Sequence, residues 1–204
     1  MKGVYVKKFG AAWLITICLG LSFQTPSVLA LPAFLDRRPM EKQKQDILQR
    51  SGEVLSALYE HQPEAKTSVE SAYGYATFSN FGMKIFFAGG GSGRGVAVNN
   101  QTGNKTFMNM AEIQAGLGLG VKKFMLVWVF ENQNAFDEFV NSGWAFGGQA
   151  SAAAKAGDKG GSYQGALAVA SGVWLYQLTD AGLALELTVK GTKYYKDNDL
   201  NEFK

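Results

Sequence analysis

Apolar residues recur at helical spacing between residues 40 and 59, and charged residues occupy the opposite side of the same pattern. This periodicity predicts an amphipathic helix over 40–59. Gly52 falls inside the pattern and lowers helix propensity, which leaves two shorter helical pieces open as an alternative. Pro63 suits the first turn of a helix and predicts a second, short helix over 64–71. The apolar positions near one face of the first helix are Ile47, Leu48, Val54, Leu55, Leu58 and Tyr59.

The spacing of apolar residues changes to that of β-strands after Ser71. A strand over 73–78 is expected to stop at Ser79-Asn80, and the polar segment 99–104 predicts a turn. Lys122-Lys123 interrupts an alternating pattern just before a continuous apolar run. An apolar segment over 83–88 runs through glycines into 96–98, and a return strand is predicted over 106–110. An alternating strand is predicted over 111–121, followed by a strand over 124–130 that is buried on both faces.

A short helix is predicted after the apolar run, because Asn134 suits an N-cap and Gly143 suits a helix end. Phe136, Phe139 and Val140 would share one face of that helix. After this helix we expect a strand within 144–156 and a mobile loop over 157–161. Three strands follow, over 166–169, 173–179 and 184–190, separated by turns at Gly172 and 180–182. The tail is expected to fray after Tyr195.

These elements predict an α+β fold in one domain over 40–204, preceded by a lead-in over 31–39. The N-terminal helices occupy 40–71. The β-rich part, 72–195, is expected to form a strongly curved, glycine-rich antiparallel sheet or a small barrel. One short helix is inserted around Asn134 to Ser142.

Glycine alternates with other residues in two of the predicted strands. Glycine weakens a strand, so its repeated placement on one face calls for a physical reason. One interpretation is that these strands curve sharply and pack closely against another layer. The other is a smooth groove that admits a lipid chain or a peptide. The residues concerned are Gly89, Gly91, Gly93 and Gly95 in the first strand, and Gly116, Gly118 and Gly120 in the second.

The N-terminus has the pattern of a secretory signal peptide. Lysines precede an apolar run of about 13 residues, which is shorter than the roughly 20 that a spanning helix needs. Val28 and Ala30 suit the positions before a cleavage site, so a cut after Ala30 is predicted. A retained membrane anchor is the alternative. Lipidation at Cys18 is disfavoured by the large Ile17 before it, and Cys18 fits the apolar core of the signal.

Removal of residues 1–30 changes the charge of the chain. The full sequence has 20 Lys and Arg and 17 Asp and Glu, and the signal contains three lysines and no acid. The exported part is therefore formally neutral, with 17 charges of each sign, and no overall basic field indicates nucleic-acid binding. It also contains no cysteine, so its stability is expected to come from burial alone. We expect a periplasmic or extracellular location, with possible membrane association.

Catalytic and metal-binding motifs are not supported. His61 is the single histidine, and it falls at a predicted helix end where it caps carbonyls or is exposed. One histidine without a cysteine cannot build a zinc site. Neither glycine cluster has the spacing of a dinucleotide or phosphate-binding loop. We therefore expect no enzyme activity, no cofactor and no metal.

Basic residues provide candidate contacts for anionic lipid head groups. Some lie in or before the first helix, where intermixed acids dilute the charge and an ordinary docked helix is the alternative. The candidates are Arg37, Arg38, Lys42, Lys44, Arg50, Lys84, Arg94, Lys122 and Lys123.

From about Leu55 to the C-terminus the sequence resembles the SYLF domain family, which includes a domain of a yeast actin-binding protein. The residues that carry the resemblance are Leu58-Tyr59 with Pro63–Lys66, Ala72–Phe78, Gly89-Gly90 with Gly93 and Gly95-Val96, the strand containing Gly116, Phe130–Asn132 with Ala135-Phe136 and Phe139, Phe146-Gly147, and Gly182-Leu183. The departures are Ser79-Asn80 where the family usually has proline, and Thr106-Phe107 in place of a Gly-Tyr stretch.

The resemblance implies binding to acidic phospholipids or phosphoinositides, and to actin in eukaryotic members. It also links an N-terminal amphipathic helix, here Arg37 to Tyr59, to membrane contact. Export makes actin an unlikely partner for this chain. The leading expectation is a non-enzymatic protein of the cell envelope that binds anionic phospholipid at a membrane surface. A structural or protein-interaction module of the envelope, with no lipid ligand, is the alternative.

Overall fold

The computed structural model describes residues 38–85, 88–115, 120–146, 163–179, 182–183 and 192–202. The predicted signal peptide, most of the lead-in and Arg37 lie outside these residues. The helices are α1 (Met40–His61), α2 (Ala65–Ser71), α3 (Gln133–Asp137), the π-helical turn η2 (Glu138–Ser142) and α5 (Asn198–Asn201). The strands are β1 (Gly74–Ile85), β2 (Ala88–Asn99), β3 (Lys105–Ala115), β4 (Gly120–Phe130), β5 (Trp144–Phe146), β6 (Leu167–Ala170), β7 (Val173–Thr179), β8 (Gly182–Leu183) and β9 (Thr192–Lys196).

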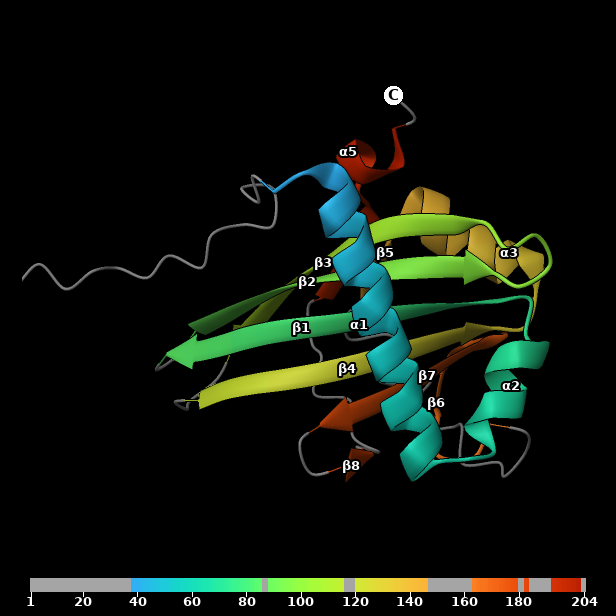
Figure 1. The fold of residues 1–204 in the computed structure, drawn as a ribbon. Helices are drawn as coiled ribbons and strands as arrows, with labels where there is room; N and C mark the ends of the chain where they lie inside the picture. The colour runs from blue at the N-terminus through green and yellow to red at the C-terminus, as the bar shows by residue number, and fades with distance from the viewer. Residues whose placement is uncertain are drawn as a thin grey trace, which may run out of the picture. The chain divides into compact units, whose positions relative to one another are not determined.

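The strands of the described residues form one antiparallel sheet of nine strands. Their order is β5-β9-β3-β2-β1-β4-β7-β6, with β8 paired to β7. The sheet is curled, and α1 lies across one of its faces (Figure 1). The α+β class, the N-terminal helices, the curved antiparallel sheet and the short inserted helix were all predicted, and the structure confirms them.

We call the face beneath α1 the outer face and the opposite one the inner face. On the outer face, Val54 and Leu58 of α1 pack with Val127, Val129 and Tyr176 of the sheet. Thr77 also lies there, and its hydroxyl donates to Ser51 Oγ of α1 over 2.7 Å. Because apolar burial drives this docking, the buried stripe of α1 fixes where the helix crosses the strands.

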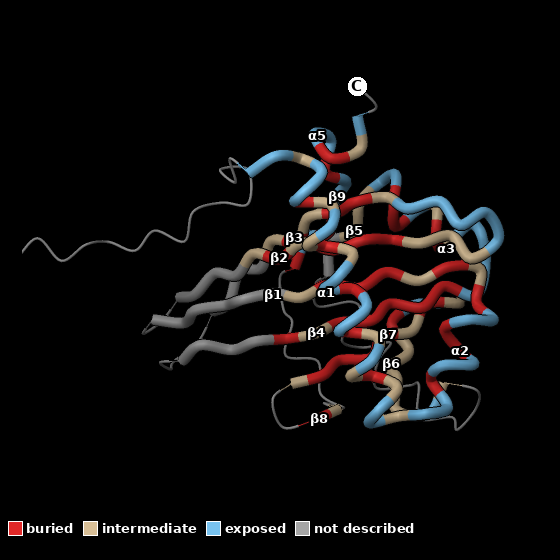
Figure 2. Tube along the Cα trace, in the orientation of Figure 1, coloured by how far each residue is buried: buried red, intermediate tan, exposed pale blue. Residues whose placement is uncertain are grey.

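The inner face carries an aromatic core beneath α3 and η2. Trp128 of β4 lies 5.6 Å from Phe139 of η2 and 5.1 Å from Tyr194 of β9, measured between ring centroids. Phe78 of β1 packs edge-on against Tyr194 at 4.9 Å. Figure 2 shows the buried residues concentrated where α1 and α3 flank the strands. The predicted strand 124–130 is confirmed, since Phe124 and residues 126–130 are all buried.

Several boundaries differ from the predictions in the helical part. α1 is one continuous helix through Gly52, because Gly52 is exposed and the buried face on either side outweighs its low propensity. The N-cap of α3 is Asn132 and not Asn134: its side chain accepts a hydrogen bond from Ala135 N over 3.0 Å. Gly143 ends η2 with φ of 69°, as predicted.

The strands near the first hairpin also differ. β1 does not stop at Ser79-Asn80 but continues to Ile85, because it is paired on both sides, with β2 and with β4. The alternating segment 111–121 is not one strand. Its first five residues end β3, and Gly120-Val121 begin β4, which also contains Lys122-Lys123. An alternating pattern continues unchanged when the chain leaves one strand and enters another.

The C-terminal region is ordered further than predicted. β9 pairs with β3 and β5, and α5 follows it with Leu200 buried, so the chain does not fray after Tyr195. The predicted turn over 99–104 and strand over 173–179 are confirmed. β5 covers only Trp144–Phe146 of the predicted strand 144–156. The remainder of that strand, the loop 157–161 and the strand 184–190 lie outside the described residues.

Candidate functional site

Two basic residues near the start of α1, Arg38 and Lys44, interact with neighbouring side chains. Arg38 forms an ion pair with Asp46. Lys44 Nζ lies 3.5 Å from Glu41 Oε1 and 5.9 Å from the centroid of the Phe107 ring. A cation paired in this way is a weaker contact for an external anion than an exposed one, since binding would have to compete with the existing partner.

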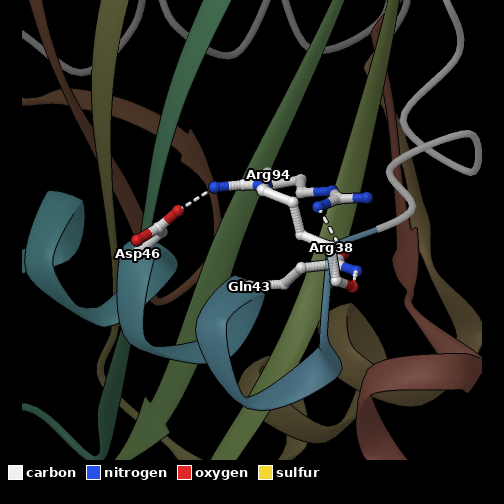
Figure 3. A network of polar contacts seen from close by, with 4 residues as sticks. All are labelled: Arg38, Gln43, Asp46 and Arg94. Carbon is white, nitrogen blue, oxygen red and sulfur yellow. Dashed lines mark hydrogen bonds and ion pairs between the residues drawn. The ribbon is translucent and has the colours of Figure 1, made fainter.

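Arg94 serves the docking of α1 on β2 (Figure 3). Its Nη1 donates to Gln43 Oε1 over 2.8 Å, and Gln43 Nε2 donates in turn to the carbonyl oxygen of Arg38 over 2.6 Å. Gln43 is only 6% exposed, so this amide bridges the strand and the start of the helix within a largely buried contact. Arg94 therefore has a structural role beside any role in ligand binding.

Lys42 and Arg50 are the exposed cations of α1 among the predicted candidates. Neither makes an ion pair within the part of the chain that the structure describes. They lie on the solvent side of a helix whose opposite side is buried on the sheet. In this position they could contact anions without any change in the fold.

The three remaining lysines come together through strand pairing. Lys84 of β1 is opposite Gly120 of β4, and Lys122 is opposite Gly82. Positions 84 and 122 are therefore diagonal neighbours in the backbone pairing of β1 with β4. Lys123 follows in the chain and is opposite Phe81. The pairing thus brings the backbone positions of three lysines from distant parts of the sequence to one end of β1 and β4.

Gly93 and Gly95 of β2 fall on the inner face, as their alternation predicted. Gly93 and Gly95 are buried. A Cβ atom at Gly95 would lie 2.7 Å from Cε1 of the Phe78 ring, so this glycine is required by close packing. Gly89, Gly91 and Gly120 continue the same face by register. Gly116 and Gly118 lie outside the described residues.

An aromatic pair around Glu131 was not predicted from the sequence. The Trp174 indole nitrogen donates to Glu131 Oε1 over 3.1 Å. The Tyr163 ring stacks on Trp174 at 4.7 Å with an interplanar angle of 16°. Burial and the Glu131 carboxylate raise the pKa of Tyr163. The contact joins residues from three separate segments, so local periodicity carries no sign of it.

A group of tyrosines lies between the helices and the outer face. Burial, aided by the charge of Glu70, raises the pKa of Tyr59 to about 12. Burial likewise raises the pKa of Tyr75, and that of Tyr176 to about 12. These hydroxyls stay neutral at physiological pH, so they supply packing and hydrogen-bonding capacity and no charge.

Among the described residues, no group of three or more His, Cys, Asp or Glu side chains lies close enough together to hold a metal ion. His61 Nδ1 lies 2.9 Å from the carbonyl oxygen of Ala57, in the last turn of α1, as expected for a helix-end histidine. The search for a membrane-crossing helix among the described residues also found none.

Comparison with known proteins gives two matches. Residues 111–203 match the family Ysc84, described as "Las17-binding protein actin regulator". A relative from Aeromonas veronii, named Beta cell expansion factor A, is 34% identical over 151 residues, which are 73% of this chain and 55% of the relative. The chain thus spans about half the length of the curated relative it matches.

The curled sheet with its N-terminal helix and short inserted helix, together with these matches, defines a SYLF-type domain. The chain belongs to the SYLF family, to which the Ysc84 model corresponds. Membership of this family is linked to binding of lipid or actin.

Proposed function

We propose that this protein is exported and binds acidic phospholipids at a membrane surface of the cell envelope, without catalysing a reaction. The observation that carries the proposal is the meeting of Lys84, Lys122 and Lys123 at one end of β1 and β4. A cluster of cations attracts an anionic bilayer, and each lysine near the surface contributes about 1 kcal/mol. The family link to lipid supports the same choice.

Export supports lipid over actin as the ligand. The N-terminal residues have the pattern of a signal peptide, which directs the domain away from the cytosol. Lys42 and Arg50 on the exposed side of α1 would add a second, weaker contact. On this view the domain lies on the membrane through its surface charges, and the buried face of α1 stays on the sheet.

Co-sedimentation of the purified protein with vesicles of increasing phosphatidylglycerol content tests the proposal. The variant Lys84→Gln/Lys122→Gln/Lys123→Gln should lose roughly two orders of magnitude in affinity, at about 1 kcal/mol per lysine. The matched control Lys66→Gln/Lys105→Gln/Lys193→Gln changes the net charge equally at three exposed positions elsewhere. It should keep most of the binding.

Two results would contradict the proposal. Absence of binding at every vesicle composition would leave a structural or protein-interaction module as the better explanation. Equal losses in the two triple variants would show that net charge alone matters and that the lysine cluster does not.

A further inference from the structure

Glu131, Tyr163 and Trp174 meet on the surface just beyond the last residue of β4. Trp174 belongs to β7 and Tyr163 precedes β6, so three separate segments contribute. The Trp174 indole nitrogen donates to Glu131 Oε1 over 3.1 Å, and the Tyr163 ring stacks on the Trp174 ring. We call these three residues the aromatic–carboxylate cluster.

The Glu131 carboxylate is exposed and is positioned by its neighbours. Burial raises the pKa of Tyr163, and the charge of Glu131 and a hydrogen bond to its carboxylate raise that pKa further. The carboxylate therefore lies near the Tyr163 hydroxyl as well as the Trp174 indole. Within the part of the chain that the structure describes, Glu131 forms no ion pair. A carboxylate that is held in place without a cation is prepared to receive one from outside.

The surroundings of the cluster are acidic. Burial is the main cause that raises the pKa of Tyr176, and the charges of Tyr163 and Glu64 add to it. Glu64, just before α2, therefore acts on the same corner of the molecule as the cluster. Lys66 of α2 is directed elsewhere, with its Nζ 3.9 Å from Glu70 Oε1. The charges at this corner thus favour an incoming cation.

The form of the cluster favours a planar cation. Tyr163 and Trp174 are partly exposed, and their rings stack at an interplanar angle of 16°. A guanidinium stacks on an aromatic face and donates two parallel hydrogen bonds to a carboxylate. The Tyr163 ring and the Glu131 carboxylate near its hydroxyl offer both contacts to one group. A compact ammonium would gain the charge contact and less from the ring.

The cluster lies at the opposite end of β4 from the lysine positions. Glu131 directly follows Phe130, the last residue of the strand, whereas Lys122 is near the beginning. Glu131 comes nine residues after Lys122, which is about 30 Å along a strand at roughly 3.3 Å per residue. A ligand at one end therefore does not compete for the groups at the other.

We propose that the aromatic–carboxylate cluster binds an arginine side chain of a protein partner. The guanidinium stacks on the face of the Tyr163 ring that is turned away from Trp174, and it pairs with the Glu131 carboxylate. The Trp174 indole keeps that carboxylate in position. The inference goes beyond the proposed function, since it concerns a different end of the sheet and a different class of ligand.

Nuclear magnetic resonance of the isotope-labelled exported chain tests this with the blocked peptide acetyl-Gly-Arg-Arg-Gly-amide. The indole N–H resonance of Trp174 reports on the cluster, because that group donates to Glu131. We expect a saturable shift of this resonance. The same peptide with citrulline in place of arginine is uncharged and should give no shift at equal concentration. Tetramethylammonium, which carries the cationic group of choline, should give a much smaller shift because it has no hydrogen to donate.

Conservative variants separate charge from stacking. Glu131→Gln removes the charge but keeps an oxygen that can accept from the Trp174 indole, and should weaken peptide binding about fivefold. Tyr163→Leu removes the ring and should weaken binding by a similar factor, whereas Tyr163→Phe keeps the ring and should retain most of the affinity. The matched controls are Glu138→Gln on η2 and Tyr195→Leu on β9, at exposed positions outside the cluster, and both should bind normally.

Three results would overturn the inference. They are the absence of a saturable shift with the arginine peptide, an unchanged affinity in Glu131→Gln, and equal shifts from the citrulline peptide or from tetramethylammonium. A purely structural role of the cluster predicts a lower melting temperature in Glu131→Gln together with unchanged peptide binding.

Vesicle binding keeps this inference apart from the proposed function. Glu131→Gln should bind phosphatidylglycerol vesicles as the natural protein does, and the triple variant of Lys84, Lys122 and Lys123 should bind the arginine peptide normally. Peptide binding without vesicle binding in the natural protein would remove the proposed function alone. Vesicle binding without peptide binding would remove this inference alone.

Discussion

Asn201 of α5 pairs with the backbone of Phe107 in β3 as a neighbouring strand would. The Phe107 amide donates to Asn201 Oδ1 over 2.9 Å, and Asn201 Nδ2 donates to the Phe107 carbonyl oxygen over 2.7 Å. β9 pairs with β3 only from Met108 onward, so this side chain extends the pairing by one residue. These hydrogen bonds hold the C-terminal helix α5 against the part of β3 where Phe107 packs with α1.

Replacement of Asn201 by alanine should destabilise the protein by about 1–3 kcal/mol. The Phe107 amide would lose its acceptor, and an unmet backbone amide in a partly buried position is costly. The Phe107 carbonyl oxygen would keep the hydrogen bond that it accepts from the Asp197 amide. Chemical denaturation of the variant measures the free energy of unfolding. Asn198→Ala, at an exposed position of the same helix, is the control and should change it little. Similar values for the two variants would mean that the Asn201 pair contributes nothing.

Gly95→Ala should be strongly destabilising, by about 1–3 kcal/mol, because the added methyl group overlaps the Phe78 ring and the Thr77 carbonyl oxygen. The neighbouring strand backbone cannot move without breaking its ladder. Thermal unfolding with circular dichroism measures the effect. A variant as stable as the natural protein would show that the aromatic core tolerates this displacement.

Gly52→Ala should have the opposite effect. A Cβ atom at Gly52 would meet nothing within 4 Å, and the residue lies in the middle of α1. Alanine at an exposed helical position gains about 0.5–1 kcal/mol over glycine. The same thermal measurement should therefore give a higher melting temperature. A decrease would indicate that α1 needs flexibility at this point.

Stability should decline at alkaline pH through the buried tyrosines. The pKa of Tyr176 is 10.0 unfolded and about 12 folded, because burial disfavours the phenolate. The folded state therefore holds the proton more tightly, and this contribution is complete below pH 10 and is lost between about pH 10 and 12. A difference of about two in pKa corresponds to at most about 3 kcal/mol, because nearby solvent screens the charge.

The variant Tyr176→Phe isolates this effect, since phenylalanine has no proton to lose. Its unfolding free energy should fall less steeply between pH 10 and 12 than that of the natural protein. Tyr195→Phe, at a position that is 40% exposed, is the control and should keep the natural slope. Identical pH dependence in all three proteins would exclude Tyr176 as the titrating group.

The lysine cluster illustrates what sequence patterns miss in a candidate site. Lys84, Lys122 and Lys123 were each identified as possible lipid contacts, but no pattern in the sequence grouped them. Pairing of β1 with β4 makes Lys84 and Lys122 diagonal neighbours. Arg94 was chosen on the same grounds as these lysines, and the structure finds it bound to Gln43 at the base of α1.

Elements whose signals are local could be predicted from the sequence. The stripe of α1, the turn over 99–104, the buried strand 124–130 and the strand 173–179 all follow from spacing within a few turns or residues. The glycine alternation likewise placed Gly93 and Gly95 on one face. Hydrophobic period and turn chemistry act through neighbours in the chain, so the sequence displays them directly.

The pairing of the strands and the residues at which they end depend on the tertiary structure. The division of 111–121 between β3 and β4, the extension of β1 to Ile85 and the ordering of β9 and α5 all depend on partners distant in sequence. Strand pairing also makes the surroundings of two glycines differ: Phe78 packs against Gly95, whereas Gly91 is opposite another glycine. Strand pairing is stabilised by backbone hydrogen bonds that any residue except proline can make, and the sequence of one strand therefore does not specify its neighbour.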